Sequence, residues 1–250
     1  MDKSNLAKEA DRFDSMSQPR PKAVLLDVGG VFLLPSHSHI RTALDQVGHV
    51  VVDDELIDRA HYKAVRVFPM DLDGDEFMGP IWTAYLRAYA SSLEVPDVVM
   101  DEAIEHLRNE YVTGWLWSHL IAGSVDGLKD LAATGIPVGV VSNSDGTIEF
   151  RLRDMGVLQV GPGLGVEVRC VIDSGTVGVE KPDPAIFEPA LEILGMAGDD
   201  VWYVGDTPAF DIVGAQRAGL RPILMDPYGI NGDFGAKCVR SLSEVAASID

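Results

Sequence analysis

The sequence KAVLLDVGGVFLLP, residues 22–35, decides the fold. Its residues 23–26 are four apolar side chains that run directly into an acid, Asp27, with Gly29 and Gly30 just beyond. A short apolar run of this kind is typical of a strand buried on both faces of a parallel sheet. Asp27 would then lie at the carboxyl end of the strand, where open α/β sheets bind ligands, and the glycines would let a ligand approach the backbone. The stretch alone is equally consistent with an Asp27 that merely caps a strand before a glycine turn.

After residue 117 the sequence alternates between short apolar runs and helical patterns. Most of the expected helices stop at a glycine, and one begins with Pro184 in the favoured first turn. Such alternation predicts an α/β, doubly wound, Rossmann-like fold, with a parallel sheet and helices on both faces. The expected helices are 125–133, 147–155, 184–194 and 209–218, and the expected strands are 136–141, 168–172, 201–204 and, as the last core strand, 222–225.

Residues 36–117 carry a different pattern, in which apolar side chains recur at helical spacing, as they do from Leu56 to Val67. Breaks in the pattern leave room for about four helices. The sequence therefore predicts an α/β core, residues 21–35 and 118–250, with a helical domain inserted at 36–117. Residues 1–20 are polar and mixed in charge, and we expect a mobile tail there.

The charge balance excludes several kinds of partner. The 250 residues include 20 Lys and Arg against 39 Asp and Glu, which gives a formal charge of −19. This charge would repel nucleic acid and anionic membranes, so we expect neither as a partner, and an anionic substrate would need a local cation to attract it. No apolar run reaches the roughly 20 residues of a membrane span, and residues 1–20 lack the apolar core of a signal peptide, so we expect a cytoplasmic protein. Nothing in the sequence indicates an oligomeric state.

Polar residues cluster beside the later strands and helices. Ser142 and Asn143 follow one expected strand, Asp206 and Asp211 follow another, and Lys181 shortly precedes a helix. Each alone has an ordinary alternative as a helix cap, a turn or a solvated loop. Together they are the groups that phosphoryl transfer needs. A carboxylate that attacks a dianionic ester requires a divalent cation, further carboxylates to hold that cation, and a lysine against the phosphoryl oxygens.

These motifs, in this order, resemble those of the haloacid dehalogenase superfamily. Asp27 in LLDVGGV is similar to the nucleophile motif, Ser142 in VVSNSD to the phosphate-binding motif, Lys181 in VEKPDPAIF to the lysine motif, and Asp206 with Asp211 in YVGDTPAFD to the acidic motif. The resemblance covers the chain from about residue 22 onward. The placement of residues 36–117 resembles the helical cap of the first type in that family, which closes over the sheet and selects the substrate.

The resemblance implies a magnesium-dependent hydrolase of small phosphorylated metabolites, which cleaves phosphate monoesters through an aspartyl-phosphate on Asp27. It also implies a Mg²⁺ site built from oxygen ligands, to which Gly29 would contribute its carbonyl. The implied catalytic residues are Asp27, Ser142 and Lys181; the implied metal ligands are Asp27, Gly29, Asp206 and Asp211; and the implied substrate-binding residues are Gly29, Gly30, Ser142, Asn143 and Lys181.

One position departs from the family pattern. Phosphatases of the family usually carry a second Asp two residues after the nucleophile, as acid and base for the leaving group, and this chain has Gly29 there. Two alternatives therefore stay open: a metal-independent 2-haloacid dehalogenase, and a non-catalytic binding protein that retains the fold. If activity is retained, His37 or His39 could supply the missing proton from the helical block.

Overall fold

The structure, a computed structural model of the chain, describes residues 20–71, 79–113, 116–232 and 234–249. The mobile tail that we predict at residues 1–20 lies outside these residues, apart from Arg20. Among the described helices, none is long and apolar enough to cross a membrane.

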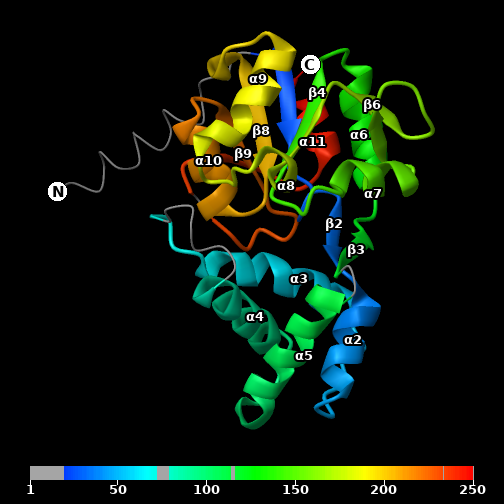
Figure 1. Cartoon of the computed structure of the whole chain (residues 1–250), viewed down its shortest axis with the longest axis vertical. Coiled ribbons are helices and arrows are strands. Elements are labelled where there is room, and N and C mark those ends of the chain that lie inside the picture. The colour runs from blue at the N-terminus through cyan, green and yellow to red at the C-terminus, as the bar shows by residue number, and fades with distance from the viewer. Residues whose placement is uncertain (1–19, 72–78, 114–115, 233, 250) are drawn as a thin grey trace, which may run out of the picture.

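A six-stranded parallel sheet forms the centre of the molecule (Figure 1). The strand order is β10-β9-β8-β1-β4-β7, and every neighbouring pair runs parallel. This sheet confirms the predicted fold class and places the first strand of the chain at the middle of the sheet. The strands are β1 (Ala23–Leu26), β4 (Val138–Ser142), β7 (Val171–Asp173), β8 (Val201–Gly205), β9 (Arg221–Met225) and β10 (Lys237–Val239).

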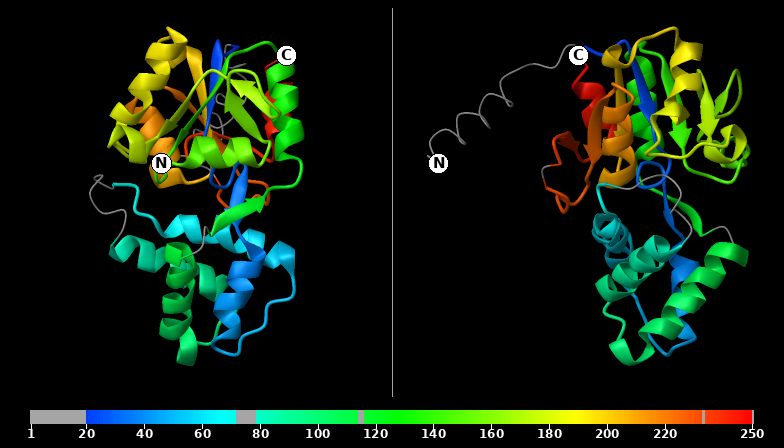
Figure 2. Two further views of the ribbon diagram at one scale, coloured as in Figure 1. Left: turned by 45° about the vertical axis from the view of Figure 1, so that its right-hand side comes forward. Right: turned by 60° about the vertical axis from the view of Figure 1, so that its left-hand side comes forward.

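The alternation of side chains along β1 divides the core into two layers. Val24 and Leu26 pack into one apolar cluster, and Ala23 and Leu25 pack into another on the opposite face; all four side chains are fully buried. The first cluster is covered by α6 (Ser124–Ala133), α7 (Ile148–Asp154) and α11 (Leu242–Ala247), and the second by η4 (Pro184–Phe187), α9 (Glu188–Leu194) and α10 (Val213–Arg217). The helices therefore flank both faces of the sheet, as Figure 2 shows.

Four helices between β2 and β3 form a separate layer below the sheet in Figure 1, and we call them the cap helices. Their number agrees with the sequence prediction. Asp53 caps the second helix by accepting the Glu55 N–H, and Pro80 occupies the first turn of the third. The cap helices share an apolar cluster that also includes Ala209 and Phe210 from the core. They are α2 (His37–Asp45), α3 (Asp54–Ala64), α4 (Pro80–Ser92) and α5 (Met100–Thr113), with short 3₁₀ turns η1 (Val65–Val67) and η3 (Asp97–Val99).

Two small sheets lie beside the main one. The antiparallel pair β2 (Leu33–Pro35) and β3 (Trp117–Leu120) carries the chain to the cap helices and back. The parallel pair β5 (Leu158–Val160) and β6 (Val166–Val168) is followed, after β7, by the short helix α8 (Ser174–Val177).

Several predicted boundaries are wrong. The strand at 222–225 is not the last of the sheet, because β10 adds an outer strand. The single strand expected at 168–172 is two short strands, since the chain leaves β6 at Val168 and enters the main sheet at Val171. The helices expected at 184–194 and 209–218 each begin with a different helix type: η4 precedes α9, and the π-helix η6 (Pro208–Ile212) precedes α10.

Candidate active site

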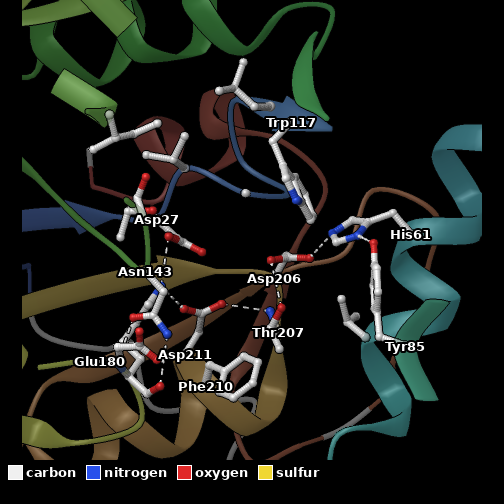
Figure 3. A pocket seen from close by; sticks show the side chains of 18 of the residues that line it. Asp27, His61, Tyr85, Trp117, Asn143, Glu180, Asp206, Thr207, Phe210 and Asp211 are labelled. Atoms are coloured by element: carbon white, nitrogen blue, oxygen red, sulfur yellow. Dashed lines mark hydrogen bonds and ion pairs between the residues drawn. The ribbon is translucent and has the colours of Figure 1, made fainter. Parts of the chain in front are cut away.

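The sheet topology brings predicted site residues together at the edge formed by the carboxyl ends of the parallel strands. β1 pairs with β4 on one side and with β8 on the other. Asp27 directly follows β1, Ser142 ends β4, and Asp206 directly follows β8. A cavity of about 620 Å³ lies between this edge and the cap helices (Figure 3). Its lining includes all the predicted site residues except Gly30, namely Asp27, Gly29, Ser142, Asn143, Lys181, Asp206 and Asp211.

A buried lysine connects two of the three acids. The Lys181 Nζ lies 2.8 Å from Asp27 Oδ1 and donates to Asp211 Oδ1 at 2.7 Å. It also donates to the Tyr203 hydroxyl at 2.8 Å, and that hydroxyl lies 3.0 Å from the same Asp211 oxygen. The Lys181 side chain is only 2% exposed. The sequence analysis missed Tyr203, because a tyrosine inside a buried strand has the same pattern as an ordinary core residue.

Burial and neighbouring charges oppose each other at this site. Burial raises the pKa of Asp27 to about 7, and the charge of Asp211 acts in the same direction, whereas the Lys181 ammonium acts against both. Burial alone would lower the pKa of Lys181, but the charges of Asp211 and Asp27 outweigh it and hold that pKa above its ordinary value. Lys181 is therefore a cation at any physiological pH, while Asp27 ionises near neutrality.

The acidic loop after β8 is held by its own backbone. Thr207 donates its N–H to Asp211 Oδ2 at 2.8 Å, and the Asp211 N–H donates back to the Thr207 carbonyl. Asp211 lies in the π-helix η6, a wide turn that is frequently found at functional sites. A Cβ on Gly205 would lie 2.2 Å from Asp211 Cγ, so only glycine fits there.

Gly30, a predicted substrate-binding residue, does not line the cavity. Its N–H donates to the Leu33 carbonyl, and its carbonyl accepts the Tyr62 hydroxyl at 2.8 Å, so both backbone groups are engaged. Its φ is +62°, and a Cβ would lie 2.2 Å from Asp206 Cγ. Gly30 is therefore required for the close approach of the turn after β1 to the Asp206 side chain.

The loop after β4 is tied to the lysine segment. The Asn143 side-chain amide donates to the Lys181 carbonyl at 3.0 Å and accepts the Lys181 N–H at 2.8 Å. Farther along this loop, Asp173 accepts the N–H groups of Gly146 and Ile148 at 2.9 and 3.1 Å. The side chain of Asn143 thus positions the backbone of Lys181.

The donor set fits a magnesium ion. Asp27, Asp206 and Asp211 each offer a carboxylate oxygen, and these oxygens lie within 4.8 Å of one another. All three residues are buried, and Lys181 alone cannot neutralise three carboxylates. Buried carboxylate oxygens in excess over cations are the ligands that a hard divalent ion prefers.

His61 also lines the cavity and contacts the site, although the sequence analysis did not name it as a site residue. It lies on α3, and its Nε2 is 2.6 Å from Asp206 Oδ2, while its Nδ1 is 2.9 Å from the Tyr85 hydroxyl (Figure 3). The side chains of His61 and Asp206 are each 2% exposed. Because the two residues are 145 positions apart, no local pattern links them.

His37 and His39 do not line the cavity. His37 Nε2 lies 2.7 Å from Asp58 Oδ1, and the ring stacks on His119 with centroids 3.8 Å apart. His39 Nδ1 lies 3.2 Å from Glu110. The structure therefore does not bring either imidazole to the site where one of them could have supplied a proton.

Trp117 lies beside the position of the missing acid. A Cβ built on Gly29 would be 3.5 Å from Cζ3 of the Trp117 ring, and two further ring atoms lie within 4 Å of it. Figure 3 shows the indole pointing into the cavity near Asp206. The space beside Gly29 is thus bounded by an apolar ring.

Comparison with known proteins places this geometry in a family. Residues 21–219 match the family model of the haloacid dehalogenase-like hydrolases. Over 236 residues the chain is 33% identical to a phosphoglycolate phosphatase of Rhodospirillum rubrum, a match that covers 92% of this chain and 88% of the relative. Over 146 residues it is 31% identical to the haloacid dehalogenase-like hydrolase domain-containing protein 3 of Danio rerio, covering 58% of this chain and only 57% of that protein.

A solved structure shows the same fold. A HAD-superfamily hydrolase of Ehrlichia chaffeensis superposes with a TM-score of 0.55 at 18% identity, over 92% of this chain and 96% of that one. The family model covers most of the chain and includes all four motifs. This chain therefore belongs to the haloacid dehalogenase-like hydrolase family.

Proposed function

We propose that this chain is a magnesium-dependent phosphatase that hydrolyses small phosphate monoesters through an aspartyl-phosphate on Asp27. The observation that carries the proposal is the buried group of Asp27, Asp206 and Asp211 around one permanent cation, Lys181. A phosphoryl dianion can enter such a site when a divalent cation offsets the carboxylates. The similarity to a phosphoglycolate phosphatase supports the same reaction class.

The proposed reaction has two steps. An oxygen of the ionised Asp27 carboxylate forms a bond to phosphorus while the bond from phosphorus to the leaving oxygen breaks, and that oxygen departs with the electron pair and takes up a proton. Water then attacks the acyl phosphate, which releases inorganic phosphate and restores the carboxylate. Lys181, 2.8 Å from Asp27, is positioned to neutralise the phosphoryl oxygens, and Ser142 and the Asn143 N–H would orient them.

The metal ligands that we propose are Asp27, Asp206 and the carbonyl of Gly29. Bound Mg²⁺ would supply charge neutralisation and polarisation of the phosphoryl oxygens. The role of Asp211 is a supporting one. Its Oδ1 contacts Lys181 and Tyr203, and its Oδ2 accepts the Thr207 N–H.

We also propose that residues 36–117 act as a cap that covers the site and selects the substrate. Supporting this role, Val65, Phe68, Trp82 and Tyr85 from this region line the cavity that contains Asp27. The cap also contacts the metal site directly, through His61.

A panel of phosphate esters, assayed with magnesium and with EDTA, tests the reaction. We expect phosphate release that EDTA abolishes and that is lost in Asp27→Asn. Rapid quenching with a ³²P-labelled ester should trap a hydroxylamine-sensitive label on the wild type and none on Asp27→Asn. Chloride release from 2-chloro acids that persists in EDTA would identify a dehalogenase instead, and inertness towards both panels would identify a binding protein.

Calorimetric titration with Mg²⁺ tests the metal site independently of turnover. We expect Asp206→Asn to weaken binding at least tenfold, because it removes a charged ligand. The matched control is Asp126→Asn, since Asp126 is 80% exposed on α6. Equal affinities in wild type and Asp206→Asn would remove the metal assignment.

A further inference from the structure

Aromatic rings form a continuous wall of the cavity. Phe68 stacks on Tyr85 with centroids 5.7 Å apart, and Tyr85 stacks on Trp82 at 4.7 Å. Phe68 also contacts Phe210 of the core at 4.8 Å, and Trp82 contacts Tyr111 at 5.2 Å. All five rings line the cavity, as does Trp117. A flat, apolar group would bury its faces well against such a wall.

The cations of the cavity are already paired with carboxylates. Among the described lining residues, Lys181, Arg151 and His61 are those that can carry a positive charge. Lys181 lies between two acids of the site; Arg151 Nη2 donates to Asp145 Oδ2 at 2.9 Å; and His61 lies 2.6 Å from Asp206.

A second anionic group on the substrate would therefore enter an unfavourable environment. Glu180 and Asp145 also line the cavity. A carboxylate buried beside these acids and the aromatic wall would lose its hydration without gaining a cation. A neutral leaving group avoids this cost.

The absence of a general acid at Gly29 also favours an aromatic leaving group. Gly29 supplies no acid, and the ring of Trp117 lies beside it. The pKa of a phenol is about 10. The pKa of water, which an alcohol resembles in acidity, is about 15.7. A phenolate can therefore depart without the proton that an alkoxide needs.

We infer that the substrates are aryl phosphates, in which a neutral aromatic ring carries the phosphorylated oxygen, and that esters with a carboxylate in the leaving group are disfavoured. The inference rests on the proposed phosphatase function and names the class of ester for that site. The aromatic wall recognises the ring, the group around Asp27 and Lys181 binds the phosphoryl moiety, and the phenolate leaves unprotonated.

Binding of phosphonates that cannot be hydrolysed separates recognition from turnover. Calorimetry in magnesium buffer would compare three phosphonates. Phenylphosphonate measures the contribution of an aromatic ring to binding, phosphonoacetate that of a carboxylate, and methylphosphonate the binding of the head group alone. We expect phenylphosphonate to bind at least tenfold more tightly than phosphonoacetate. In parallel, kcat/KM for phenyl phosphate should exceed those for benzyl phosphate and phosphoglycolate.

Variants locate the recognition on the wall. Phe68→Leu should weaken phenylphosphonate about 2- to 12-fold, the range expected for one aromatic contact, without changing methylphosphonate. Tyr111→Leu is the second variant, and it is less disruptive because Tyr111 is only partly buried. The matched control is Phe150→Leu, since Phe150 is 60% exposed on α7 and does not line the cavity.

The outcomes distinguish this inference from the proposed function. Equal or tighter binding of phosphonoacetate, or a preference for phosphoglycolate in turnover, overturns the aryl assignment and leaves the phosphatase proposal intact. Wall variants that behave as Phe150→Leu does would also overturn it. If no phosphonate binds and no ester is hydrolysed, the proposed function fails and the inference falls with it.

Discussion

Gly29 and Trp117 together define how this site differs from the usual family pattern. The residue that normally protonates the leaving group is absent, and an indole lies against the position from which its carboxylate would extend. The Cβ contact of 3.5 Å is an ordinary one, and Gly29 is not in the left-handed region, so a side chain can be introduced. The carboxylate of an Asp introduced at this position would extend into the space that the indole of Trp117 bounds.

The double variant Gly29→Asp/Trp117→Ala should therefore gain activity on esters with basic leaving groups. General acid catalysis typically contributes about 10²–10⁴-fold, so we expect roughly a 10²-fold gain on alkyl phosphates. The measurement is kcat/KM across a series of esters with rising leaving-group pKa. The rate should fall steeply in wild type and flatten in the double variant.

Trp117→Ala alone is the control for the loss of the ring, and it should keep the steep fall because it adds no acid. Gly29→Asp alone should give a smaller gain than the double variant. A flat series in wild type would contradict this account, since it would mean that another group already protonates the leaving oxygen.

Some residues of the site could be predicted from a local sequence pattern, and others could not. Asp27, Ser142 and Asp206 could be predicted because each directly follows, or ends, an apolar strand, and the ends of parallel strands meet at one edge. His61 and Trp117 could not be predicted in this way. Each contacts the site from the cap or the returning strand, and the contact exists only after segments far apart in sequence have packed together.

Helix α3 contacts the proposed metal site through His61. His61 Nε2 lies 2.6 Å from Asp206 Oδ2, and the pair is buried. His61→Ala would leave the Asp206 carboxylate without this partner, so we expect a loss of about 1–3 kcal/mol in unfolding free energy without divalent cations. The loss should shrink in magnesium, because the ion would give the Asp206 carboxylate a different partner. Urea unfolding in EDTA and in magnesium would measure both values.

His106→Ala is the matched control for that experiment. His106 lies on α5, and its contact with Glu102 is 3.8 Å long and partly exposed, so its loss should cost at most about 0.5 kcal/mol. In a double-mutant cycle, His61→Ala and Asp206→Asn should not be additive. Additive effects would show that the two side chains are not energetically coupled. Equal losses with and without magnesium would show that the ion does not replace His61 as the partner of Asp206.

Long elements could be predicted from the sequence, and short ones could not. The number of cap helices and the strands β1, β4, β8 and β9 follow from apolar runs and helical spacing that extend over several residues. β2, β6, β7 and β10 have three residues each, which is too short for an alternating pattern to emerge. Their pairing depends on the rest of the sheet, so the sequence analysis did not predict β2 or β10 and merged parts of β6 and β7 into one strand at 168–172.

The whole molecule carries a formal charge of −19 and still buries three carboxylates around one lysine. A buried acid whose folded-state pKa exceeds its unfolded-state value is stable in its protonated form and becomes unfavourable once it ionises. Burial raises the pKa of Asp27 from 3.8 to about 7, so the active site should weaken the fold at neutral pH when no metal is bound.

The stability of the metal-free protein should therefore decrease, relative to Asp27→Asn, as the pH rises from about 4 to about 7. Between the unfolded-state pKa of 3.8 and the folded-state value of about 7, the folded chain holds one proton more than the unfolded chain, and rising pH favours unfolding. The slope is at most about 1.4 kcal/mol per pH unit.

Asn cannot ionise, so the difference between the two proteins isolates Asp27 from other titrating groups. Urea unfolding in EDTA at pH 4, 5, 6, 7 and 8 should show similar stabilities at pH 4 and a more stable variant from pH 7 upward. Magnesium should reverse that order at pH 8, because it binds the ionised carboxylate. A difference that does not change with pH would mean that Asp27 is ionised throughout.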